Sequence, residues 1–99
     1  MELKIEAFRA WVNERPADNV WVTNSGCYCP VADWFAHSNP TFTDVSVGIP
    51  TICWRDSGNE SHSVGVKWVN DCIHRVDRQG DYITQPDLLA IVDDIPGDE

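Results

Sequence analysis

Basic residues are scarce in this sequence, and the end of the chain has none. Seven Lys and Arg stand against 16 Asp and Glu, which gives a formal charge of −9, and neither Lys nor Arg follows Arg78. Nucleic-acid binding depends on cationic contacts with phosphate, so we expect no direct binding of nucleic acid. Basic protein surfaces, including those that normally hold nucleic acid, are the expected partners. The alternative is that the acidic residues serve solubility alone.

Long apolar segments are also missing. No apolar run approaches the roughly 18–20 residues that a membrane-spanning helix needs, so we expect no membrane association. Residues 1–6 alternate charged and apolar side chains and show no secretory signal. We therefore expect a cytoplasmic protein, and expect its four cysteines to be reduced.

Complete catalytic motifs are absent as well. The sequence has no Gly-rich phosphate loop, no Gly-x-Ser-x-Gly elbow, no His-Glu-x-x-His pair and no dinucleotide-binding fingerprint. Four cysteines and three histidines supply Cys–His pairs by chance, and 16 acids supply many accidental carboxylate pairs. We therefore predict a protein that is not an enzyme and needs no cofactor.

The composition indicates one folded domain, spanning residues 1–99. Of the 99 residues, 42% are apolar, and five are Trp. Apolar periodicity and turn residues predict helices at 3–15, from 30 to about 37, at about 63–79 and from 85 to 95, and short strands at 20–23, 43–48 and 51–55. These elements predict an α+β fold with about four helices packed on a small two- to three-stranded antiparallel sheet. Residues 96–99 are expected to be a frayed tail.

The most unusual local feature is the segment from Cys27 to Pro30, which reads Cys-Tyr-Cys-Pro. Cys29 would lie at the start of a helix, where the helix dipole can lower the pKa of a thiol. With one residue between the two thiols, a bridge would close a strained ring. Three interpretations stay open: a helix cap with a packed thiol, a redox pair, or part of a zinc site. Weak metal candidates are Cys27, Cys29, His37 and Cys53.

The five tryptophans fall into two groups. Trp11, Trp34 and Trp68 lie on apolar helix faces and are predicted to be in the core. Trp21 and Trp54 lie in short strands, where one face can be exposed, and exposed aromatic residues are typical of protein interfaces. The alternative is that both are buried.

The predicted last helix carries an acidic outer surface. Asp87 and Asp94 are seven residues apart, hence on one stripe of the helix, and Asp93 is adjacent. Asp81 precedes the helix, and Asp98 and Glu99 follow it. The predicted partner-binding residues are Asp81, Asp87, Asp93, Asp94, Trp21 and Trp54.

The segment Cys29-Pro30-Val31-Ala32-Asp33-Trp34-Phe35 resembles a recurrent type of small uncharacterised protein found in bacterial, mobile-element and phage genomes. The helix around Phe8, the strand at 45–47 and the last helix are similar too. That type has no established activity, so no functional residue is carried over. The resemblance implies a phage or mobile-element origin, which would place the protein in the cytoplasm of a host cell.

The sequence is therefore interpreted as a non-enzymatic acidic protein-binding module. Its proposed form is a phage-encoded inhibitor of a host nucleic-acid-binding defence complex, of the anti-CRISPR or anti-restriction type, an expectation that rests on association. The alternatives are a small thiol or zinc-site domain using Cys27 and Cys29, or an accessory domain that homodimerises through Trp21 or Trp54. The sequence leaves the oligomeric state open.

Overall fold

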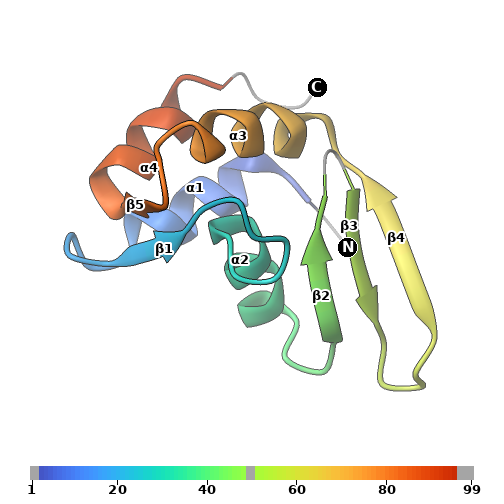
Figure 1. Ribbon diagram of the computed structural model, residues 1–99. Helices are drawn as coiled ribbons and strands as arrows, with labels where there is room; N and C mark the ends of the chain where they lie inside the picture. Colours follow the sequence, from blue (N-terminus) through green and yellow to red (C-terminus); the bar gives the residue numbers. More distant parts are fainter. Residues whose placement is uncertain (1–2, 49–50, 96–99) are drawn as a thin grey trace.

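The computed structural model describes residues 3–48 and 51–95, which form four helices and five strands (Figure 1). In chain order these are α1 (Ile5–Asn13), β1 (Val20–Val22), α2 (Pro30–Ser38), β2 (Thr43–Val47), β3 (Thr51–Arg55), β4 (Ser61–Gly65), α3 (Lys67–Asp77), β5 (Tyr82–Thr84) and α4 (Gln85–Asp93). The predicted α+β class is confirmed. The predicted frayed tail at 96–99 lies outside the described residues.

The strands form two separate antiparallel sheets. The larger has the order β2-β3-β4, and the smaller pairs β1 with β5 across most of the chain length. We refer to the β1–β5 pair as the ribbon. In Figure 1 the four helices lie to one side of the larger sheet, and α2 is next to β2.

An aromatic core joins the helices. The fully buried Phe8 ring of α1 lies 5.3 Å from the ring centroids of both Trp34 in α2 and Trp68 in α3. The indole nitrogen of Trp68 donates a hydrogen bond of 2.8 Å to the carbonyl oxygen of Leu3. Trp11 is buried too, so the predicted core role of these three tryptophans is confirmed.

The helix boundaries follow from capping and proline chemistry. α2 begins at Pro30, since proline lacks the N–H group that the first helical turn does not use. The Cys29 sulfur accepts a hydrogen bond of 3.5 Å from the Ala32 backbone N–H, so this thiol is the N-cap of α2. Gly80 adopts φ +103° just after α3, a conformation that glycine tolerates best.

One predicted boundary is wrong. The helix expected at about 63–79 begins only at Lys67, and residues 61–65 form strand β4 instead. β4 is an edge strand with exposed Ser and His side chains, so it carries almost no apolar alternation. Its pairing partner, β3, holds it in the sheet, and that tertiary contact is invisible to local periodicity.

Within the described residues, no helix combines the length and apolar character needed to cross a membrane.

Candidate functional site

The ribbon displays apolar side chains on its outer face. Trp21 is opposite Ile83, and both are buried on the inner face. Because successive strand residues point to opposite faces, Val20 and Val22 of β1 and Tyr82 of β5 point outward. Their exposed fractions are 52%, 41% and 64%, and Val22 is directly opposite Tyr82. These three residues are named the ribbon patch.

The ribbon patch gathers most of the large exposed apolar side chains of the described chain. Only Tyr28, which precedes α2 and is 73% exposed, is a further large exposed apolar residue within residues 3–48 and 51–95. Single exposed apolar residues are normal on protein surfaces, but a contiguous group of them marks an interaction site. The ribbon patch is therefore the candidate interaction surface of the described residues.

Two of the predicted acidic residues lie on either side of β5 in the sequence. Asp81 immediately precedes β5, and its carbonyl oxygen accepts a hydrogen bond of 3.0 Å from the Thr23 backbone N–H. Asp87 lies in the first turn of α4, which follows β5 directly. Both side chains are exposed, and neither forms an ion pair with any described residue. Their carboxylates are available to a cationic partner.

The other two predicted acidic residues form surface ion pairs with the protein's own arginines. Asp93 pairs with Arg9 of α1 at 3.1 Å, and Asp94 pairs with Arg75 of α3 at 2.7 Å. The expected single acidic surface along α4 is therefore divided: its start is free, and its end is paired. Asp98 and Glu99 lie outside the described residues.

Of the two interpretations of Trp21, exposed or buried, the structure supports the buried one, so its indole is not available as a partner-binding residue. The side chain is 5% exposed, and its ring centroid lies 6.0 Å from that of Trp11. Its indole nitrogen donates a hydrogen bond of 2.9 Å to Oδ2 of Asp33. Trp21 is the central residue of β1. Because successive strand residues point to opposite faces, its side chain faces inward while those of Val20 and Val22 face outward.

Trp54 is half-buried in a stack of rings. Its ring centroid lies 5.6 Å from that of Phe42 and 5.4 Å from that of His62, with an interplanar angle of 17° in each case. The indole is therefore packed among other rings, and only part of it is exposed.

The cysteine candidates do not come together as a metal site. Cys29 and Cys72 are buried, Cys53 is half-buried, Cys27 is exposed, and all four are free thiols. Burial raises the pKa of the Cys29 thiol despite the backbone N–H groups of Ala32 and Val31 that favour thiolate. Thiolate, the form that binds zinc and attacks disulfides, is thus disfavoured at Cys29. The helix-cap interpretation is the one that this geometry supports.

In the described ranges, the group of potential metal ligands that does come together is Asp56, Glu60 and His62 in the β3–β4 turn. The Asp56 carboxylate has a structural task there. Its Oδ1 accepts hydrogen bonds from the backbone N–H groups of Gly58 and Glu60, and its Oδ2 lies 2.7 Å from Nε2 of His62. The bond to His62 is the main cause that lowers the pKa of Asp56. These hydrogen bonds stabilise the β3–β4 turn, and they explain why the three side chains lie close together without invoking a metal ion.

The sequence analysis named Asp81 and Asp87 as candidate partner-binding residues but did not predict the ribbon patch. Strands of three residues carry little periodic signal, and the pairing of β1 with β5 joins residues from opposite halves of the chain. The Val-Trp-Val alternation at 20–22 was the available indication, but local sequence does not tell which face of such a strand is buried.

Comparison with known proteins gives no relative: no family model, curated protein or solved structure matches this chain.

Proposed function

We propose that this protein is a non-enzymatic acidic binding module that docks its ribbon onto a basic protein surface. The observation that carries the proposal is the ribbon patch, an exposed apolar group on β1 and β5, with the unpaired carboxylates of Asp81 and Asp87 on either side of β5 in the sequence. An apolar centre with a charged rim is the usual arrangement of a protein interface.

The two parts of this surface have different physical roles. Tyr82 is a rigid side chain with a large apolar area and a polar end, and tyrosine is enriched among residues that dominate binding energy. Asp81 and Asp87 at the rim accelerate association with a cationic partner and make it dependent on salt. The formal charge of −9 extends the same attraction over a longer range.

The proposal keeps the partner class expected from the sequence and moves the contact surface. Docking is centred on the ribbon and the start of α4, and the paired end of α4 with Asp93 and Asp94 contributes little. A host nucleic-acid-binding complex as the partner, which the resemblance to phage proteins implies, stays a prediction.

The test compares variants that differ only in position. Tyr82→Ser removes the large ring of the ribbon patch, and Tyr28→Ser is the matched control because that tyrosine is exposed elsewhere. Once a partner has been captured from host lysate and purified, we expect Tyr82→Ser to weaken its binding by about tenfold or more. Tyr28→Ser is expected to leave the dissociation constant unchanged.

The acidic rim is tested in the same way. The double variant Asp81→Asn with Asp87→Asn should slow association and reduce its dependence on salt. Its control is Asp93→Asn with Asp94→Asn, which removes the same charge from the paired end of α4. Unchanged binding by both Tyr82→Ser and the first double variant would contradict the proposal.

A further inference from the structure

The two outer edges of the larger sheet are protected very differently. At β2, the Val47 backbone N–H donates a hydrogen bond of 2.7 Å to the carbonyl oxygen of Gly26, so the loop before α2 covers the Val47 end of this edge. A Cβ atom at Gly26 would lie 3.2 Å from the Val47 carbonyl oxygen, which favours glycine at this close approach. The register also shifts between Thr43 and Ser46, and Asp44 adopts φ +52°. A bulge and a covering loop both prevent the addition of another strand.

The β4 edge has none of these devices. β4 pairs with β3 in continuous register from Ser61 opposite Arg55 to Gly65 opposite Thr51. Its sequence, Ser-His-Ser-Val-Gly, contains no Lys, Pro, Asp or Glu. No backbone group in the described ranges bonds to its outer side, and Figure 1 shows it as the outermost strand, on the side away from α2. Proteins usually block such an edge, and an open one is a template for strand pairing.

The hairpin geometry shows which backbone groups are free. The Asp56 N–H donates to the Glu60 carbonyl oxygen at 3.0 Å, so this pair is hydrogen-bonded. In an antiparallel ladder hydrogen-bonded pairs recur at every second residue, so His62 and Val64 direct their backbone groups toward β3. Ser61, Ser63 and Gly65 therefore direct theirs outward.

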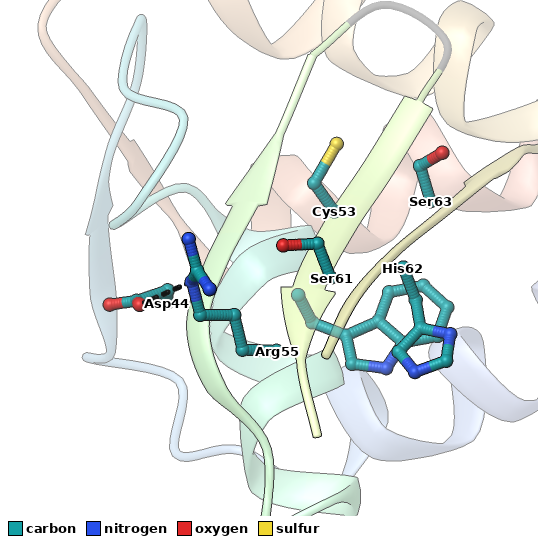
Figure 2. Close-up of a pocket in the computed structure, with 7 residues that line it drawn as sticks. Asp44, Cys53, Arg55, Ser61, His62 and Ser63 are labelled. Carbon is teal, nitrogen blue, oxygen red and sulfur yellow. Dashed lines mark ion pairs between the residues drawn. The ribbon is translucent and has the colours of Figure 1, made fainter. Parts of the chain in front are cut away.

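The sheet face next to this edge is almost free of charge. Its side chains include Cys53, Ser61 and Ser63, around a hollow of about 350 Å³ (Figure 2). Among the residues that line this hollow, Arg55 and Asp44 are charged and satisfy each other, since Nε of Arg55 lies 3.3 Å from Oδ2 of Asp44. A basic partner finds little attraction here, unlike at the ribbon. Two copies with a charge of −9 repel each other overall, and a locally neutral edge is a surface that adds little to this repulsion when they meet.

We propose that β4 pairs antiparallel with β4 of a second copy, about a two-fold axis at Ser63, and joins the two larger sheets into one. In this register Ser61 is opposite Gly65 of the second copy, and the two Ser63 residues are opposite each other. All three are residues whose backbone groups point outward, so each of these pairs is a hydrogen-bonded pair, and His62 opposite Val64 is the non-hydrogen-bonded pair between them. Their small side chains allow close approach.

The charges at the two ends of β4 agree with this arrangement. Glu60 precedes the strand and Lys67 follows it. Antiparallel pairing brings the acidic start of each strand beside the basic end of the other. The contact is self-complementary, as a two-fold interface requires. It goes beyond the proposed function, since the ribbon belongs to the separate smaller sheet and is not used.

Sedimentation equilibrium over a concentration series tests the proposal. We expect reversible formation of a dimer of the 11.2 kDa chain. Ser63→Lys places two like charges opposite each other at the axis and should raise the dimer dissociation constant by about tenfold or more. Ser46→Lys is the matched control, because it adds the same charge to a half-buried serine of β2 and should leave dimerisation unchanged.

A second variant keeps the test independent of charge. Ser63→Pro removes an N–H group that points away from β3, a position where an edge strand tolerates proline. We expect a monomer whose near-ultraviolet circular dichroism matches that of the original protein. The proposal is overturned if the original chain stays monomeric at every concentration up to about 1 mM. Such a result would mean a dimer dissociation constant above about 1 mM, that is, binding weaker than about −4 kcal/mol. A dimer that neither Ser63 variant weakens also overturns the proposal.

Discussion

The indole nitrogen of Trp21 donates a hydrogen bond of 2.9 Å to the carboxylate of Asp33. This bond joins β1 of the ribbon to the first turn of α2, and it satisfies the polar atom of a buried side chain. It also places a carboxylate at the positive end of a helix, where the dipole favours it. The bond therefore anchors the inner face of the ribbon to α2, on the side opposite the ribbon patch.

Loss of this carboxylate should destabilise the fold. Asp33→Ala leaves the Trp21 N–H buried without a partner, and we expect the free energy of unfolding to fall by about 1–3 kcal/mol. Urea denaturation followed by tryptophan fluorescence measures the change. Asp33→Asn keeps an acceptor oxygen and should cost less. Equal losses in the two variants would assign the effect to the helix dipole and contradict a role for the hydrogen bond.

The β3–β4 turn should respond to acid through Asp56. Its pKa is lowered, chiefly by the hydrogen bond to His62. A carboxyl group with a lowered pKa in the folded state stabilises the fold above the unfolded pKa of about 3.9, and this contribution is lost as the pH falls through the lower folded value. NMR titration should give an Asp56 midpoint below its ordinary value. His62→Ala should move that midpoint upward, and an unchanged midpoint would exclude His62 as the cause.

The cysteines should differ strongly in reactivity. Burial raises the pKa of Cys72 to about 12, and it also raises the pKa of Cys29. At pH 8 we expect iodoacetamide to alkylate exposed Cys27 first, and to reach Cys29 and Cys72 only after unfolding. Mass spectrometry of peptides from native and denatured protein measures the order. Rapid native labelling of Cys29 would restore the redox interpretation.

The same two thiols predict a loss of stability at high pH. A thiol whose pKa is raised in the folded state contributes stability that is complete below its unfolded pKa, near 8.5, and is lost as the pH rises toward the folded value. For Cys72 this window ends at about 12. Cys72→Ala would flatten the alkaline side of the unfolding profile, at the cost of a small cavity.

The helices were predictable because their signals are local. The apolar spacing of Ile5, Phe8 and Val12 repeats within a few residues, and Pro30 marks the start of α2 through its own backbone chemistry. β4 was missed because an exposed edge strand has no apolar stripe and depends on its neighbour. Local rules describe elements that carry their own pattern, and fail for elements that exist through pairing.

The candidate site was predictable only in part for a similar reason. Composition indicates an acidic end of the chain but does not tell which carboxylates are free. Arg9, from the opposite end of the chain, reaches Asp93, and the fold alone brings them together. Asp87 stays free because no described basic side chain lies within ion-pairing distance of it. Which carboxylates remain unpaired depends on tertiary structure.

The loop that contains Gly26 accepts a hydrogen bond from Val47 of β2, and this contact limits which assemblies the larger sheet can form. With β2 closed, a sheet extended through β4 has no further free edge, so growth stops after one addition. Fibres need an acceptor at both ends of each unit, and within the described residues the larger sheet offers a single one, at β4. Crowding of many copies in a cell would then yield discrete particles and not polymers. Opening the covered side, for example by lengthening the loop before α2, should convert a terminating contact into a propagating one.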